Sequence, residues 1–224
     1  MTAQVSGRFE PDMDVVMERA SRGLRLAHEV MQQTGLPFVT SLTIANDRIS
    51  MESAEEFMAE TGQPAWQAAT IVGSYSRMDW VERAWKSGLI SDSKMLEMLP
   101  HWWSGSDPDD TEMRFLALWA KMRRLHNNRV ILSDPTRRLP RERLLTIYRG
   151  QDPVSEATPD GHLPVGIAWS LDKSIAERFA RGAATRQSDR EGIVYEGRVL
   201  KSKVIAYLTG RDEEEVIVHP FDIR

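Results

Sequence analysis

The residues of this chain best suited to chemistry lie in its last third, and the first of them is a guanidinium at the end of a strand-like run. Arg149 ends the β-prone run LLTIYRG together with Gly150. A guanidinium is always charged and can bind phosphate oxygens with two hydrogen bonds, and a glycine lets a ligand or another chain segment come close. Arg149 is therefore a candidate phosphate anchor, although taken alone it fits a surface arginine in a salt bridge better.

A hydroxyl follows in the segment AWSLDKSIAERFA, where a strand ends at Ser170 and a helix begins after Asp172. Side chains alternate across a strand, so Ser170 and Ala168 point to one face and Trp169 to the other. Taken alone, this pattern indicates a helix cap beside a packed tryptophan.

Carboxylates open the last strand-like run. Glu213, Glu214 and Glu215 lead directly into an apolar segment. Alternation along an extended strand predicts that Glu213 and Glu215 share one face with Ile217, about 7 Å apart. Two carboxylates so placed can act on one substrate, whereas an acidic run alone indicates a solvated turn.

In this order, the three features resemble the R-S-E signature of arginine-type (cholera-toxin-like) mono-ADP-ribosyltransferases. The resemblance covers residues 148–220. It implies a split pair of sheets with a cleft for NAD, helices packed in front, and transfer of ADP-ribose from NAD to an acceptor with release of nicotinamide.

Carried over by position, the resemblance assigns Arg149 to the NAD phosphate and Ser170 to the serine motif. Glu215 becomes the catalytic glutamate, and Glu213 the upstream acid that accompanies a protein arginine as acceptor. The family usually has serine at the position of Ala168, where it holds the catalytic glutamate in place. We expect the strands of Arg149 and Glu215 to lie side by side and enclose the dinucleotide.

The same resemblance implies further contacts to NAD around this site. Two arginines come from the polar segment RGAATRQSDREG, for which a solvated loop is an equally good interpretation. No metal is predicted, because His162 and His219 lack partners at metal-ligand spacing. The expected NAD-contacting residues besides Arg149 and Ser170 are Tyr148, Gly150, Trp169, Phe179, Arg181 and Arg186.

Composition and charge narrow the class of protein. The 224 residues carry 29 basic and 33 acidic side chains, a net charge of −4, and no cysteine. These values exclude disulfides and thiolate metal sites and give no global bias toward nucleic acid. The longest apolar run, Phe115–Ala120, is too short to cross a bilayer, and the N-terminus lacks a secretory apolar segment. We therefore expect a cytoplasmic protein without a membrane partner, and delivery into another cell stays open.

The elements that must position the site fall into two regions. Apolar residues at three-and-four spacing predict a helix between Asp12 and Gly35, with Met17 and Leu24 on its apolar stripe, several short helices over 53–99, and a helix over 107–125. Beyond Pro140, short β-prone runs over 144–150, 165–170, 192–200, 203–208 and 214–220 are interrupted by the helix after Asp172. We predict an α+β fold, with a helical region 1–139 packed on a mixed or antiparallel sheet core of the ADP-ribosyltransferase type over 140–224.

Other functions remain open at this stage. Water could replace the acceptor, which would make the protein an NAD glycohydrolase. A nucleic-acid base could be the acceptor. An inactive module of the same fold could bind nucleic acid or an acidic protein through a basic stretch in which two acids, Asp134 and Glu142, face eight basic residues: Lys121, Arg123, Arg124, Arg129, Arg137, Arg138, Arg141 and Arg143.

Overall fold

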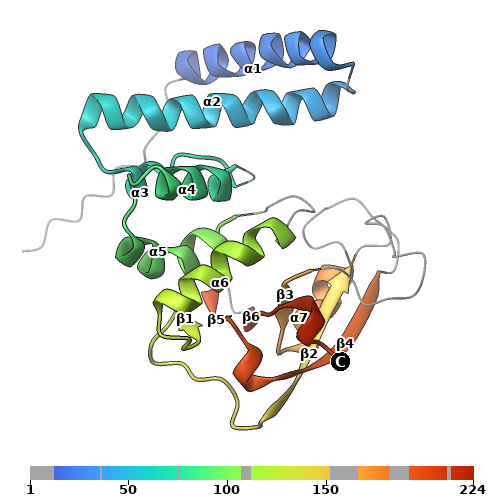
Figure 1. Cartoon of the computed structure of the whole chain (residues 1–224). Coiled ribbons are helices and arrows are strands. Elements are labelled where there is room, and N and C mark those ends of the chain that lie inside the picture. The colour runs from blue at the N-terminus through green and yellow to red at the C-terminus, as the bar shows by residue number, and fades with distance from the viewer. Residues whose placement is uncertain are drawn as a thin grey trace, which may run out of the picture.

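Two long consecutive helices pack against each other as a hairpin at one end of the molecule (Figure 1). The structure is a computed structural model that describes residues 13–35, 37–74, 76–106, 112–151, 166–181, 192–210 and 213–224. Helix α1 (Met13–Thr34) ends at Gly35, whose φ of 71° is left-handed and whose amide binds the carbonyl of Met31, as the sequence predicted. Helix α2 (Phe38–Thr61) is one long element, so the expectation of only short helices from residue 53 onward is wrong for its last turns.

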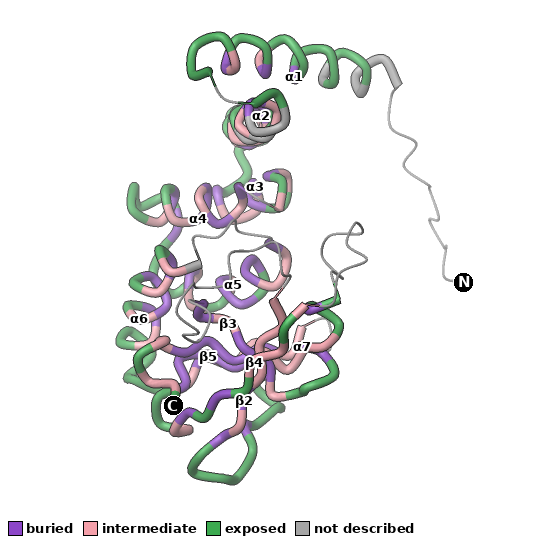
Figure 2. The backbone as a smooth tube through the Cα atoms, turned by 90° about the vertical axis from the view of Figure 1, so that its right-hand side faces the viewer, coloured by how far each residue is buried: buried purple, intermediate pink, exposed green. Residues whose placement is uncertain are grey.

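The buried face of α1 differs from the predicted stripe. Ala27 and Val30 are buried at 0% and 1% exposure, whereas Met17 and Leu24 are 61% and 52% exposed. Helix α1 lies on α2, which covers one side of it, and most of α1 is exposed (Figure 2). The stripe prediction is therefore wrong for Met17 and Leu24.

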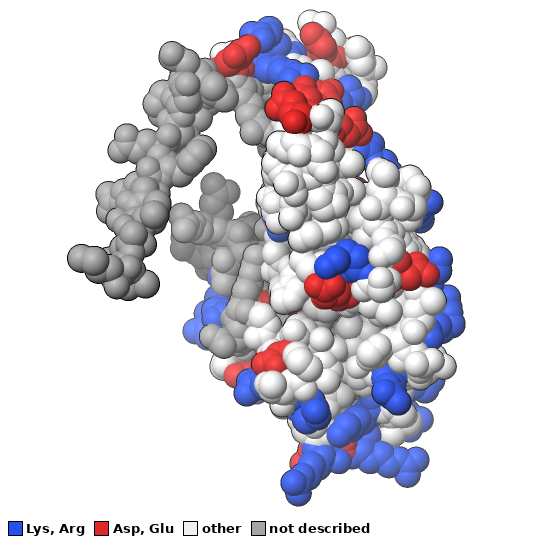
Figure 3. Space-filling view, turned by 90° about the vertical axis from the view of Figure 1, so that its left-hand side faces the viewer, with Lys and Arg blue, Asp and Glu red and all other residues white. Residues whose placement is uncertain are grey.

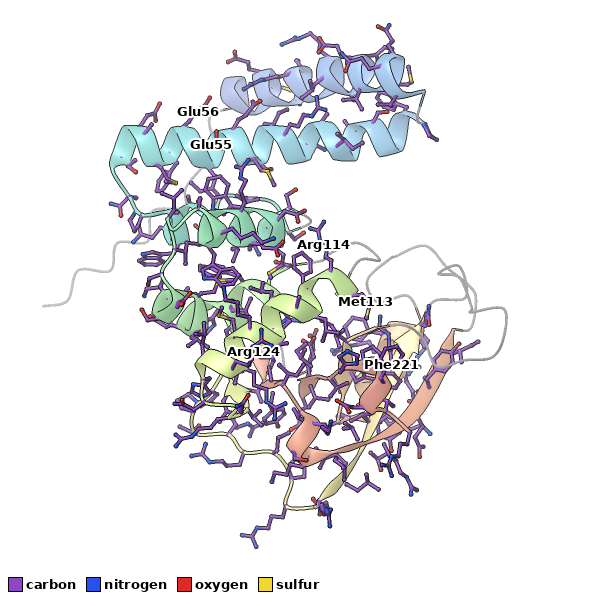
Figure 4. All side chains as sticks on the ribbon, viewed as in Figure 1. Glu55, Glu56, Met113, Arg114, Arg124 and Phe221 are labelled. Atoms are coloured by element: carbon purple, nitrogen blue, oxygen red, sulfur yellow. The ribbon has the colours of Figure 1, made fainter. Side chains whose placement is uncertain are left out.

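Shorter helices connect this hairpin to the sheet. Arg114, which Figure 4 labels, lies in the 3₁₀ turn just before the last of them and forms an ion pair with Asp79 of the helix Arg77–Lys86. The expected helix start at Asp107 and Pro108 lies outside the described residues. The elements are α3 (Ala65–Ala68), α4 (Arg77–Lys86), α5 (Asp92–Ser104), a 3₁₀ turn (Glu112–Phe115) and α6 (Leu116–Leu125).

The strands of the described residues form one six-stranded mixed sheet in the order β1-β5-β6-β3-β2-β4. Strands β1 and β5 are parallel, and the other neighbours are antiparallel. The α+β prediction is confirmed, but these strands make a single sheet and not a split pair. The elements are β1 (Ile131–Leu132), β2 (Leu144–Gln151), β3 (Ala168–Ser170), α7 (Lys173–Ala180), β4 (Ile193–Leu200), β5 (Ala206–Leu208) and β6 (Glu215–Ile217), with 3₁₀ turns at Lys201–Lys203 and Pro220–Asp222.

Each face of the sheet borders a separate core. One face packs against α5 and α6, and its buried residues join the tryptophans of those helices in a cluster that includes Ala206, Leu208 and Ile217. The other face carries the second cluster, which includes Ile147 and Trp169. The larger cluster contains residues from both the helical region and the strand region, so the two regions share a core.

Candidate active site

Three predicted site residues lie in one row across neighbouring strands. Tyr148 of β2 is the register partner of Ser170 of β3, and Ser170 is the register partner of Glu215 of β6. Partners in a sheet ladder point to the same face. Tyr148, Ser170 and Glu215 therefore point to the same face, the one covered in part by α5 and α6, although their strands come from distant parts of the chain.

Ser170 connects its strand to the segment of Glu213, Glu214 and Glu215, here called the acidic turn. Its hydroxyl donates a hydrogen bond to the backbone carbonyl of Glu213 over 2.8 Å and accepts one from the amide of Asp172 over 3.0 Å. The amide of Leu171 also donates to the carbonyl of Glu214 over 3.0 Å. With 7% exposure, Ser170 is buried. Its side chain thus fixes the backbone around the acids and the start of α7.

The carboxylate of Glu215 is held from the helical region. The indole N–H of Trp103, in the last turn of α5, donates to Glu215 Oε1 over 2.8 Å. The Trp103 ring is 5% exposed and meets Phe115 and Trp119 edge to face, with centroids 6.0 and 5.7 Å away. Sequence reasoning missed this contact, because no spacing rule relates a helix end to a strand 112 residues away.

The acidic run is not a continuous extended strand. Glu214 has a φ of 42°, in the left-handed region that residues with side chains seldom adopt, and β6 begins only at Glu215. The predicted alternation therefore holds for Glu215 and Ile217, which share a face, but cannot be extended to Glu213. Glu214 instead points toward Arg137, with 3.7 Å between Oε1 and Nη2.

Arg149 lies near this row but on the other face of β2. Its Nη1 donates to the carbonyl of Ala168 over 2.6 Å, and a Cβ on Gly166 would lie 2.3 Å from its Cζ. The glycine thus leaves room for the guanidinium at the start of β3. Strand β3 lies between β2 and β6, so the expectation that the strands of Arg149 and Glu215 are adjacent is wrong. Two strand spacings put their Cα atoms roughly 10 Å apart.

Gly150 admits a helix against the sheet. A Cβ at this position would lie 1.8 Å from the carbonyl oxygen of Ala176, so α7 packs directly on the backbone of β2. Helix α7 begins at Asp172, whose carboxylate accepts from the amide of Ser174 over 2.8 Å. Hydrogen bonds from Ser174 lower the pKa of the Asp172 carboxyl from its ordinary value. The cap fixes the helix that borders the row.

The other expected NAD contacts have different surroundings. Trp169 is buried in the second core, and its indole N–H donates to the carbonyl of Gly166 over 3.1 Å. Phe179 on α7 is 37% exposed. Arg181 follows α7 and lies 3.8 Å from the carboxylate of Glu177. Arg186 lies outside the described residues.

The basic stretch 121–143 joins α6 to the sheet, and several of its cationic side chains contact backbone carbonyls or an aromatic ring of the same chain. Arg123 donates to the carbonyls of Asn128 and Ser202, and Lys121 lies 4.1 Å from the centroid of the Trp85 ring. Basic atoms gather at the lower end of one face of the molecule (Figure 3), where the segment after α6 lies. The stretch is therefore partly structural, and within it Arg137 lies beside Glu214.

Within the residues the structure describes, no group of three histidine or acidic side chains could hold a metal ion, and none of the helices there is long and apolar enough to cross a membrane.

A groove of about 380 Å³ lies between α2 and α4, lined by residues that include Met58, Trp80 and Leu89, and none of the predicted site residues lines it. Comparisons with models of protein families, with curated proteins and with solved structures found no match to this chain.

Proposed function

We propose that this chain is a mono-ADP-ribosyltransferase that transfers ADP-ribose from NAD to a protein arginine and releases nicotinamide. The observation that carries the proposal is the row formed by Ser170 and Glu215 on the adjacent strands β3 and β6, with Arg149 on the next strand, β2, where it points to the other face of the sheet. These are the residues that the R-S-E resemblance selects from the sequence. Their closeness in the sheet did not follow from their order in the chain.

Glu215 has the chemistry required at the reacting ribose. When the bond between nicotinamide and the ribose C1′ breaks, the bond electrons leave with nicotinamide, and positive charge develops on the sugar ring. A carboxylate close to the ring stabilises that charge, as in glycoside hydrolysis. The half-buried Glu215, held by Trp103, supplies such a carboxylate in a fixed position.

Arg149 would bind the pyrophosphate of NAD. Its bond to the Ala168 carbonyl fixes the guanidinium near the end of β2 and the start of β3. A charge held in one place can fix the dinucleotide in one orientation, which lowers the entropic cost of reaching the transition state.

A protein arginine is the acceptor that the acidic turn suits best. A protonated guanidinium is a poor nucleophile. A carboxylate must therefore accept a proton from the guanidinium as the guanidinium nitrogen bonds to the ribose C1′. Glu213 is the candidate for this role. Its carbonyl accepts a hydrogen bond from Ser170, and its amide donates to the carbonyl of Gly210 over 3.3 Å, so both backbone polar groups of Glu213 are held.

The proposal is tested by incubating the full chain with NAD labelled in its adenylate part, together with a cell extract. Free nicotinamide and labelled macromolecules are measured, and the label is challenged with protease, nuclease and hydroxylamine, which cleaves arginine linkages in the resembled family. We expect nicotinamide release and protease-sensitive, hydroxylamine-sensitive label, both absent with Glu215→Gln.

Other outcomes separate the alternatives. Nicotinamide release without label indicates an NAD glycohydrolase, and nuclease-sensitive label indicates a nucleic-acid acceptor. Absence of nicotinamide release from the intact folded chain contradicts the proposal.

A further inference from the structure

We propose that Trp103 is a positioning residue for Glu215, so that the helical region completes the candidate active site. The inference deepens the proposed function and rests on it for the catalytic part of its test. It assigns a role in the site to a residue of the region 1–139, where no site residue was predicted.

The bond between the two side chains joins distant parts of the chain. The indole N–H of Trp103 donates to Glu215 Oε1 over 2.8 Å, within the range of a good hydrogen bond to a carboxylate. An N–H aimed at one oxygen fixes both the position and the rotation of the carboxyl group. Because Trp103 is 5% exposed, water has little access to compete for this contact.

The tryptophan is itself held rigidly. Its ring lies edge to face against Phe115 and Trp119, at interplanar angles of 82° and 79°, and both neighbours are fully buried. The end of α5 is also fixed, because Arg77 of α4 donates to the carbonyl of Gly105 and Ser106 Oγ donates to the carbonyl of Trp102 over 2.6 Å. A donor on so rigid a support keeps an acceptor in one geometry.

The residues of β3 nearest to Glu215 do not explain how its carboxylate is positioned. Ala168 points to the same face as Glu215 and is its diagonal neighbour, because Ala168 pairs with Ile217 and Ser170 pairs with Glu215. A diagonal neighbour is within reach of a long side chain, but alanine has no hydroxyl to donate. The hydroxyl of Ser170, directly opposite, donates to the backbone of Glu213. The contact from α5 supplies a donor that Ala168 cannot provide.

A matched pair of variants tests the inference in the full chain. Trp103→Phe removes the indole N–H and part of the ring. Trp102→Phe makes the same change one residue earlier, where the side chain is 3% exposed and the N–H has no hydrogen-bond partner among the described residues. For nicotinamide release we expect Trp103→Phe to lower kcat about ten- to hundredfold relative to Trp102→Phe, with a KM for NAD within about twofold.

Rescue distinguishes positioning from packing. Adding Ala168→Ser to the Trp103→Phe variant places a hydroxyl diagonal to Glu215, and we expect it to restore a measurable part of kcat. The same addition to Trp102→Phe should restore nothing, because there the bond to Glu215 is intact. An equal fall of kcat in the two tryptophan variants, or the absence of selective rescue, overturns the inference.

A second measurement is independent of NAD chemistry. Thermal unfolding of wild type, Trp103→Phe, Glu215→Leu and the double variant forms a double-mutant cycle for the hydrogen bond. We expect the double variant to lose clearly less Tm than the sum of the single losses. Additive losses overturn the inference even in an active protein. If the wild type releases no nicotinamide but the losses are non-additive, the proposed function fails and the contact stands.

Discussion

The hydroxyl of Ser170 is bonded to the backbone carbonyl of Glu213 over 2.8 Å, across the gap between β3 and the turn that precedes β6. The serine therefore acts on the acids through the backbone and not by contact with a carboxylate. The Ser170 hydroxyl oxygen also accepts a hydrogen bond from the amide of Asp172, the residue that caps α7. One buried side chain thus connects the strand, the helix and the acidic turn of the candidate site.

Replacing this serine should loosen the turn. Ser170→Ala leaves the Glu213 carbonyl and the Asp172 amide without their partner, which should cost about 1 to 3 kcal/mol of unfolding free energy. We expect transfer to the acceptor to fall more than NAD cleavage, because the turn carries Glu213. Chemical denaturation and the two activities measure these effects. Ser170→Thr, which keeps the hydroxyl, is the control, and equal effects of the two variants would exclude the hydrogen-bond explanation.

The negative charge of Glu215 should be required for the reaction but not for the stability of the fold. Glu215→Gln keeps an oxygen that can accept the Trp103 N–H but removes the negative charge. We expect nicotinamide release to fall about a hundred- to thousandfold, the scale of losing a principal electrostatic group, with little change in Tm or NAD binding. Glu214→Gln is the control, because Glu214 faces Arg137 outside the row. Parallel loss of Tm and activity in Glu215→Gln would indicate a structural residue.

Local features of this chain could be predicted from the sequence because they depend on neighbouring residues. The end of α1 at Gly35 follows from the left-handed conformation that glycine tolerates. The start of α7 at Asp172 follows from the ability of an aspartate to accept a backbone amide. Strand β2 has nearly the predicted bounds, because β-prone residues fill it and charged residues precede it.

The features of the site that were not predicted from the sequence share a physical cause. The contact of Trp103 with Glu215 depends on how α5 packs over the sheet, which no local pattern encodes. The left-handed conformation of Glu214 breaks the alternation that an acidic run suggests. The insertion of β3 between β2 and β6 depends on strand order, which cannot be read from the alternation of single strands. Tertiary packing decided each of these features.

Arg149 should affect NAD binding beyond its effect on the fold. Arg149→Ala removes the bond to the Ala168 carbonyl and the candidate phosphate anchor together, so a lower Tm without NAD is expected. The informative quantity is the further rise of Tm upon adding saturating NAD, which reports binding to the folded state. We expect this rise to be largely lost in Arg149→Ala. A rise equal to that of wild type would remove Arg149 from the binding site.

Glu213 should separate transfer from hydrolysis. If its carboxylate accepts a proton from the acceptor guanidinium, Glu213→Gln should lower transfer about a hundredfold or more, within the range of general-base effects. Hydrolysis of NAD needs no guanidinium acceptor, so nicotinamide release without acceptor should change by less than about fivefold. Both are measured on the same preparation. A parallel fall of the two rates would contradict this division between Glu213 and Glu215.

Tyr207 should limit stability at alkaline pH. Burial raises the pKa of its phenol above the ordinary value, the negative charge of Glu214 raises it further, and Arg137 opposes the shift. The unfolded chain therefore loses the phenol proton at a lower pH than the folded chain. The contribution of Tyr207 to stability is complete below about pH 10 and is lost as the pH rises through the folded-state pKa. We expect Tyr207→Phe to weaken the fall of Tm above about pH 10. Tyr195→Phe, on the same face of the sheet, controls for loss of a hydroxyl. Two neighbours test the same group: Glu214→Gln should lower the Tyr207 pKa and lessen the fall of Tm, whereas Arg137→Ala should raise that pKa. If the alkaline fall of Tm is unchanged in Tyr207→Phe, Glu214→Gln and Arg137→Ala, Tyr207 does not control stability at alkaline pH.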